Sequence, residues 1–192
     1  QKDPDWILEK VYESAVYANE HGLYIACVAE DASRADLGFL IDFAKAAKAA
    51  GASRFGYADS TGVADPFTCE ERIRMLRQIA GIDVEIIARN DFGMATANTF
   101  AAIKAGARFA RVTAMGIGQR AGCAPLEEVA MVSKHMLNID TGVDTTKLHH
   151  IAEAVSTASG VAIWPSKPII GPKCFAQEAG FANNPLVTEP YD

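Results

Sequence analysis

Polar and charged residues directly follow short apolar runs of the sequence, at positions where side chains could do chemistry. Glu30 follows the first run, Ser60 the second, and Arg89 and Asp91 the third, while Thr113 lies in the fourth. A carboxylate can transfer protons, and an arginine can hold the carboxylate of a ligand through paired hydrogen bonds. Glu30 is therefore a candidate catalytic base, and the other residues are candidate substrate contacts.

Each of these clusters also has a purely structural interpretation. Arg89 and Asp91 would share one face of an extended strand, where they could form an ion pair that closes a layer of packing. Glu30 and its neighbour Asp31 could equally form a salt bridge with Arg34 within a loop. Both interpretations stay open on the sequence alone.

A glycine-rich stretch at residues 116–122 contains Arg120 and separates a predicted strand from a predicted helix. Backbone N–H groups in such loops can bind phosphate or carboxylate, and Arg120 would add a positive charge. The spacing GxGxxxG is one residue longer than the dinucleotide fingerprint, so a tight strand-to-helix turn is the alternative. Arg120 is a further candidate for substrate binding.

Turns containing glycine recur along the chain, each between a helix-like stretch and a short apolar run, at Gly22, Gly51, Gly81 and Gly106. Glycine can take the left-handed conformation that ends a helix. The runs predict strands at 23–29, 53–58, 84–88 and 109–114. They lack strict polar alternation, which is typical of a parallel sheet covered by helices. The sequence thus predicts a repeated βα unit.

Apolar residues at helical spacing predict the helices. They form faces within 7–18 and 37–47, and further helices are expected at about 68–80, 94–105, 124–137 and 145–158. Thr68, with Glu71 three residues later, has the pattern of a capping box. Asp144 or Thr145 is expected to start the last helix.

The predicted fold class is α/β, with residues 1–160 forming βα units of a TIM-type barrel and residues 161–192 forming a loop-rich C-terminal segment. Four units amount to half of an eight-unit barrel, whose usual length is about 250 residues. A doubly wound sheet is the alternative, because periodicity alone does not separate the two architectures.

The composition excludes several classes of protein. The chain has 192 residues, of which 49% are hydrophobic and 22% charged, as in ordinary globular domains. The net charge of −6 is spread along the chain, which argues against a nucleic-acid partner. No apolar run reaches the roughly 18 residues of a membrane helix. The four cysteines form no CxxC pair, so we expect a reduced, cytoplasmic environment and no zinc site.

Several strings resemble the homocitrate synthase and 2-isopropylmalate synthase family, in the family's order and spacing from about residue 5 to residue 182. These strings are AEDASRAD (29–36), YADSTGV (57–63), NDFGMATANTFAAIKAGA (90–107), GIGQRAGCAPLEE (116–128), IDTGVDT (139–145) and FAQEAG (175–180). The branch that the chain resembles most is the homocitrate synthase associated with nitrogenase cofactor synthesis. The resemblance implies a TIM barrel, of which this chain would cover about the C-terminal half and the start of a small C-terminal subdomain.

The resemblance also implies a chemistry, the condensation of acetyl-CoA with a 2-oxo acid held by a divalent metal, Mg²⁺ or Mn²⁺. The family's metal-binding positions correspond here to Ile87, Arg89 and Cys123, and two late histidines of the family are replaced by Gln177 and Ala182. Isoleucine has no donor atom, and arginine places a positive charge where the cation would sit. We therefore expect no metal cofactor in this chain.

Three functions follow as hypotheses. The first is a homocitrate synthase-like acyltransferase homologue that has lost its metal site and is non-catalytic or one part of a split assembly. Its exposed barrel edges would then be covered by another copy or by a complementary barrel half. The second is an active, metal-independent condensing or aldolase-type enzyme in which Arg89 holds the 2-oxo acid and Glu30 is the base. The third is a module that binds an oxo acid or acyl-CoA without turnover.

Overall fold

The computed structural model describes residues 3–176, which fold into six α-helices, a four-stranded sheet and two short 3₁₀ turns. In chain order the elements are α1 (Pro4–Glu20), β1 (Ala26–Ala29), α2 (Leu37–Ala49), β2 (Arg54–Asp59), α3 (Pro66–Ala80), β3 (Asp83–Ala88), α4 (Ala95–Lys104), β4 (Phe109–Ala110), η1 (Ala114–Gly116), α5 (Leu126–Met136), η2 (Thr145–Lys147) and α6 (Leu148–Ser159).

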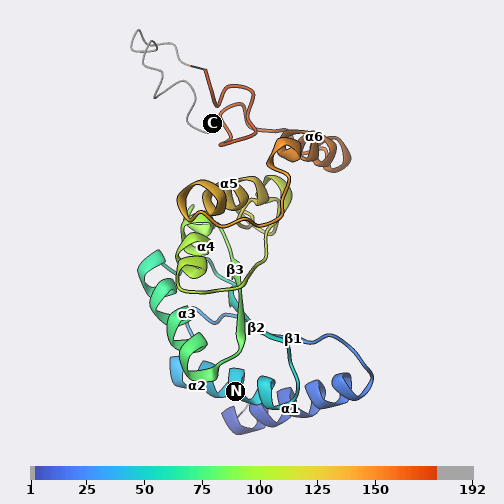
Figure 1. The fold of residues 1–192 in the computed structure, drawn as a ribbon, viewed down its shortest axis with the longest axis vertical. Helices are drawn as coiled ribbons and strands as arrows, with labels where there is room; N and C mark the ends of the chain where they lie inside the picture. The colour runs from blue at the N-terminus through green and yellow to red at the C-terminus, as the bar shows by residue number, and fades with distance from the viewer. Residues whose placement is uncertain (1–2, 177–192) are drawn as a thin grey trace.

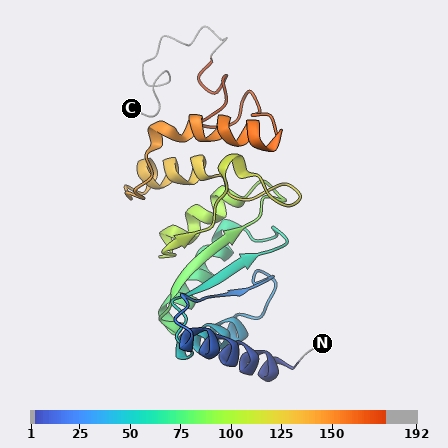
Figure 2. The same cartoon turned by 90° about the vertical axis from the view of Figure 1, so that its right-hand side faces the viewer.

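The strands lie in the order β1-β2-β3-β4, and every neighbouring pair is parallel. Figures 1 and 2 show α2, α3 and α4 on one side of this sheet, with α1 and α6 at opposite ends of the molecule. A doubly wound sheet reverses its strand order at a switch point, whereas a barrel adds each new strand beside the previous one. The barrel-type prediction is therefore confirmed, and the doubly wound alternative is wrong.

Local sequence signals set the helix ends. The Asp65 carboxylate accepts hydrogen bonds from the N–H groups of Phe67 and Thr68, at 2.9 and 3.0 Å, and Pro66 occupies the first helical position. Asp65 is thus the N-cap of α3, and the predicted capping role of Thr68 is wrong. Gly81 ends the same helix with a φ of 62°, a left-handed conformation that costs other residues energy. The three other turn glycines also have positive φ, as predicted.

The main core lies between the sheet and α2, α3 and α4. Alternate residues of β2, including Phe55 and Tyr57, point toward these helices and are fully buried. The ring of Phe55 packs edge-on against Phe43 of α2, with 5.7 Å between their centroids. Leu76 of α3 completes this side of the sheet. The opposite face of each strand is left for the barrel interior, and the functional groups of this fold lie at the carboxyl ends of the strands.

Two predicted strands are shorter in the structure. β1 begins at Ala26 rather than at residue 23, and β4 pairs only over Phe109–Ala110. Beyond β4 the chain turns back, and a parallel bridge between Thr113 and Pro125 takes the place of further pairing with β3. The sheet edge at β4 is therefore short.

Part of the segment after α6 packs against α5 and α6. Ile170 is buried against Leu148 and Ala152, and the Lys167 ammonium lies 3.5 Å from the Glu127 carboxylate. A domain boundary near residue 160 stays a prediction. Within the described residues, no helix combines the length and the apolar character that crossing a membrane requires.

Candidate functional site

The strand register places alternate residues on the inner face of the sheet. Gly56 pairs with Glu85 and Ala58 with Ile87, while Glu85 pairs with Phe109. Side chains alternate along a strand, so the face of Ala58 continues to Ser60 and the face of Ile87 continues to Arg89. These inner-face side chains line a cavity of about 310 Å³, whose walls include Glu30, Ser60, Ile87, Arg89, Arg111, Thr113 and Cys123. The structure thus brings four of the six predicted site residues to one cavity.

Arg89 lies on the wall of this cavity beside Cys123. Its Nη1 donates a hydrogen bond to Sγ of Cys123 at 3.0 Å, and the two residues form an antiparallel bridge. Gly118 lies close against this pair, since a Cβ on Gly118 would be 2.6 Å from Sγ of Cys123. Among the described residues, no carboxylate forms an ion pair with Arg89. Its remaining N–H donors can therefore bind an anion.

Glu30 and Ser60 line the same cavity as Arg89. The Ser60 hydroxyl donates to the Glu30 carboxylate and accepts from the N–H of Asp31 at 2.9 Å. The neighbouring Asp31 instead pairs with Arg34, whose hydrogen bond lowers the pKa of the Asp31 carboxyl. The loop salt bridge is therefore formed by Asp31, and Glu30 keeps its carboxylate at the cavity.

Asp91 and Arg120 bind each other outside the cavity wall. Arg120 Nε lies 2.6 Å from Asp91, and its Nη2 also donates to the backbone oxygen of Ser60 at 2.7 Å. The Arg120 hydrogen bond lowers the pKa of the Asp91 carboxyl. Of the two open interpretations, the ion pair between Arg89 and Asp91 is wrong, because the glycine-rich loop brings Arg120 to Asp91 instead. This ion pair anchors that loop to the strand ends.

The glycine-rich loop has a different geometry from the predicted one. The N–H groups of Gly116, Gly122 and Cys123 donate to loop carbonyls, so they are not available to a ligand. The next helix begins only at Leu126, after the bridge at Pro125. The loop is therefore a tight connection that closes one side of the cavity, while anion binding by the N–H groups of Gly118 and Gln119, which line the cavity, stays a prediction.

One residue that lines the cavity, Arg111, belongs to an ionic group that the sequence pattern did not single out. Arg111 Nε and Nη2 each donate to a different oxygen of Glu85, both at 3.2 Å. Arg54 Nε lies 3.3 Å from the same carboxylate, within ion-pair distance but without hydrogen-bond geometry. Alternation backward from Thr113 is the signal that could have found Arg111, because positions 109, 111 and 113 share one strand face.

The residues at the family's metal positions do not fit a divalent cation. Ile87 offers no donor, and the Arg89 guanidinium is itself a cation whose hydrogen bond occupies the Cys123 sulfur. Among residues 3–176, no three His, Cys, Asp or Glu side chains are placed to hold an ion together. The positions Gln177 and Ala182 lie outside the described residues.

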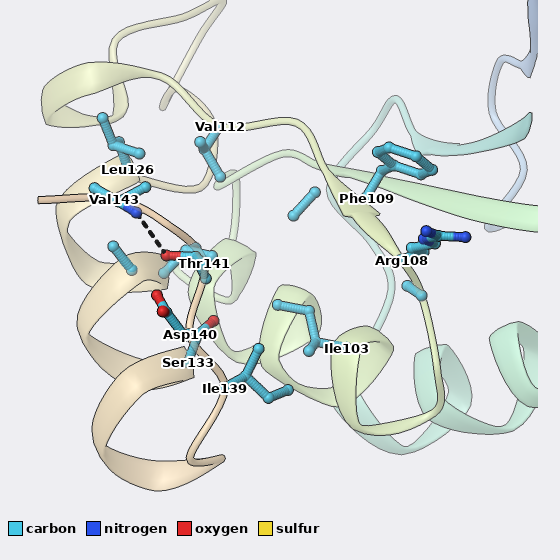
Figure 3. Close-up of a pocket in the computed structure, with 14 residues that line it drawn as sticks. Ile103, Arg108, Phe109, Val112, Leu126, Ser133, Ile139, Asp140, Thr141 and Val143 are labelled. Carbon is cyan, nitrogen blue, oxygen red and sulfur yellow. Dashed lines mark hydrogen bonds between the residues drawn. The ribbon is translucent and has the colours of Figure 1, made fainter.

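A larger cavity, about 530 Å³, lies away from this site at the outer side of β4 (Figure 3). Its walls are mainly apolar and come from α4, β4, α5 and the segment at 139–143, including Ile103, Val112, Leu126 and Val143. The Ser133 hydroxyl on this wall is buried without a hydrogen-bond partner. Because the cavity has few groups suited to catalysis, we place the candidate site in the smaller, polar one.

Comparisons with known proteins agree with this fold. The chain is 44% identical over 191 residues to 2-isopropylmalate synthase 2 of Caldanaerobacter subterraneus subsp. tengcongensis, covering all of this chain and 50% of that protein. It is 43% identical over 189 residues to homocitrate synthase 1 of Nostoc sp., covering 96% of this chain and 50% of that protein. The chain thus spans about half the length of these relatives.

Solved structures support the fold independently. The HMG-CoA lyase of Bacillus subtilis matches 80% of this chain and 55% of its own, with a TM-score of 0.71 and 19% sequence identity. The model of the family described as HMGL-like matches residues 1–155. Because that match covers most of the chain, and because the relatives include homocitrate and 2-isopropylmalate synthases, this chain belongs to the HMGL-like family.

Proposed function

We propose that this chain is the oxo-acid-binding part of a homocitrate synthase-like acyltransferase homologue that works without the family's metal ion. In this proposal the Arg89 guanidinium holds the carboxylate of a 2-oxo acid, at the place where the family holds it through the metal. The observation that carries the proposal is the contact between Arg89 and Cys123, at 3.0 Å on the cavity wall. This contact holds the Arg89 guanidinium, which keeps other N–H donors for a ligand, at a cavity wall that also contains other polar residues.

An arginine in place of a metal ion favours binding of the substrate over its activation. A guanidinium binds a carboxylate in a planar, bidentate geometry and so orients a substrate well. It polarises a carbonyl less than a divalent metal does, because it is not a Lewis acid. The cavity is therefore suited to binding a 2-oxo acid, with condensation slow or absent.

The proposal also includes a partner that completes the barrel. Apolar cavities border both edges of the sheet, one beside β4 and one between α1 and β1, lined by residues such as Ile7, Val11 and Val28. Open sheet edges with apolar surroundings favour pairing with further strands. A complementary barrel half or a second copy of this chain would cover them.

Titration with Mn²⁺, followed by electron paramagnetic resonance with and without 2-oxoglutarate, tests the metal-free proposal. We expect no stoichiometric binding by the native chain. The variant Ile87→His, Arg89→His, Cys123→Asn is the positive control, because it restores nitrogen and oxygen donors at these positions. Tight binding by the native chain that strengthens with the oxo acid would overturn the proposal and support a metal-dependent condensing enzyme.

A second candidate function is metal-independent condensation, favoured by the position of Glu30. Its carboxylate lines the same cavity as Arg89 and is oriented by the Ser60 hydroxyl, so it could remove a proton from the acyl donor. Long incubation with acetyl-CoA and a 2-oxo acid distinguishes this function from binding alone. Product that disappears in Glu30→Gln supports condensation, whereas saturable binding without product supports a binding module.

A further inference from the structure

Met115 has a backbone conformation that its side chain does not favour. Its φ is +62°, in the left-handed region, which is costly for a residue with a Cβ and has no compensation from a methionine side chain. Such a residue keeps this conformation only where the surrounding structure holds it. The contacts of Met115 therefore decide the shape of the turn at η1.

The turn at Met115 leads directly into the wall of the polar cavity. Gly116 comes next, and its carbonyl accepts a hydrogen bond from the Cys123 N–H at 2.9 Å, which closes the glycine-rich loop. Ile117 and Gly118 lie within this closed loop and line the cavity. A change of conformation at Met115 would therefore move the cavity wall.

Two contacts hold Met115, and both lead to residues 161–176, here called the C-terminal strap. The Met115 N–H donates to Oε2 of Glu127 at 3.0 Å, and the Lys167 ammonium of the strap lies 3.5 Å from Oε1 of the same carboxylate. The Met115 side chain packs against the buried cluster that contains Ile170 of the strap. The side chains of Glu127 and Lys167 are only 3% and 19% exposed, so water screens their attraction weakly.

We propose that the C-terminal strap regulates the polar cavity through Met115. With the strap docked, Lys167 and Ile170 keep Met115 in its left-handed conformation, and the glycine-rich loop closes the cavity wall. With the strap released, Met115 relaxes to an ordinary conformation and the wall opens. Met115 and Lys167 are positioning residues, since neither lines the cavity. The effect on ligand binding rests on the proposed function, whereas the coupling between strap and loop does not.

Hydrogen exchange measures this coupling without a ligand. The Cys123 amide reports on closure of the loop, and the amides of β2 are the internal reference for overall stability, since β2 belongs to the main core and not to the cluster under the strap. Lys167→Met is expected to raise the exchange rate at Cys123 about 10-fold relative to β2. Lys173→Met is the matched control, because Lys173 lies on the same strap but is exposed, and it should leave the ratio unchanged.

Met115→Asn tests whether the coupling runs through Met115. Asparagine adopts the left-handed conformation more readily than methionine does, so closure of the loop should no longer depend on the strap. In the Met115→Asn background, Lys167→Met is expected to change the relative exchange at Cys123 by about 2-fold or less. Ile170→Val loosens the strap without removing a charge and should act in the same direction as Lys167→Met, which keeps the test decisive if Lys167→Met fails to fold.

Isothermal titration with 2-oxoglutarate measures the consequence for the cavity. Lys167→Met is expected to bind the acid about 5-fold more weakly than native protein, and Lys173→Met should bind it like native protein. The double variant Met115→Asn, Lys167→Met should bind like Met115→Asn alone. Because coupling is reciprocal, 2-oxoglutarate should also slow exchange of the strap amides in native protein.

The outcomes separate the inference from the function on which it rests. If Lys167→Met and Lys173→Met give the same relative exchange at Cys123, the strap does not control the loop and the inference is wrong. If Lys167→Met acts equally in the native and Met115→Asn backgrounds, the role of Met115 is overturned. If every variant binds 2-oxoglutarate with native affinity, the regulation is refuted while the binding function stands. If the native chain binds no 2-oxoglutarate but the exchange results are as expected, the proposed function fails and the coupling between strap and loop is supported.

Discussion

The Arg89 guanidinium and the Cys123 thiol lie in direct contact, with 3.0 Å between Nη1 and Sγ, although 34 positions separate them in the sequence. The bridge between their backbones brings them together at the end of β3. A thiol is a weak acceptor, so the contact orients the guanidinium without neutralising its charge. The arginine is held in place and remains available to an anion.

Replacement of Arg89 by glutamine is expected to weaken 2-oxo-acid binding about 10-fold or more. Hydrogen bonds to charged groups contribute about 1.5–3 kcal/mol, and glutamine cannot supply the paired donors. Isothermal titration measures the change. Arg34→Gln is the control, because that arginine pairs with Asp31 in a loop that is not part of the cavity wall. Unchanged affinity in Arg89→Gln would contradict the proposed function.

Gly118→Ala and Gly22→Ala are expected to have opposite effects on binding and stability. A Cβ on Gly118 would lie 2.6 Å from Cys123 Sγ and 3.4 Å from Arg89 Nη1, so it should displace that pair and weaken ligand binding. Gly22 has open space around it but a φ of +71°, so alanine there should cost about 1 kcal/mol of stability. Titration and urea unfolding of both variants check this; equal ligand affinity in the two would refute the role of Gly118.

Lys167→Met is expected to reduce the free energy of unfolding by about 3 kcal/mol, because it leaves two partly or fully buried carboxylates without their cation. The Lys167 ammonium contacts both Glu127 and Glu128, and the Glu127 side chain is only 3% exposed. Urea unfolding followed by circular dichroism gives the value. The exposed Lys147, which pairs with Asp144, provides the control, and its replacement by methionine should have no measurable effect. A similar result for both lysines would count against a buried ionic contact.

The ion pair between Asp91 and Arg120 predicts a pH-dependent effect of Arg120→Gln. Arg120 lowers the pKa of Asp91 from its ordinary 3.8, so the folded state binds this proton less readily than the unfolded state. The stabilisation is therefore fully present above pH 4 or so and is lost as the pH falls through the lowered pKa. Melting temperatures of native protein and variant from pH 2 to 7 should converge in acid.

Part of the difference in melting temperature between native protein and Arg120→Gln should persist in acid. Arg120 also donates to the backbone oxygen of Ser60, which does not titrate. A difference in melting temperature that stays constant over the whole range would show that the carboxylate makes no contribution.

The sequence by itself determined the repeated βα units and the position of the polar residues at the strand ends. Both depend on local physical rules: glycine ends helices at residues such as Gly81, and side chains alternate along strands. Alternation also placed Arg89 and Ile87 on one face, which the cavity confirms. The cap of α3 was misassigned because Thr68 and Asp65 carry equivalent local signals, and the combination with Pro66 favours Asp65.

Only the tertiary structure decided which charged groups meet. Asp91 pairs with Arg120 rather than with the nearby Arg89, because the returning loop brings Arg120 across 29 positions of sequence. Glu85 forms ion pairs with Arg54, at the start of β2, and with Arg111, directly after β4. Ion-pair partners depend on distances between segments remote in sequence, and local periodicity contains no information about those distances. The arrangement of helices and strands can therefore be predicted from the sequence, while the ion pairs around the cavity can be assigned only from the tertiary structure.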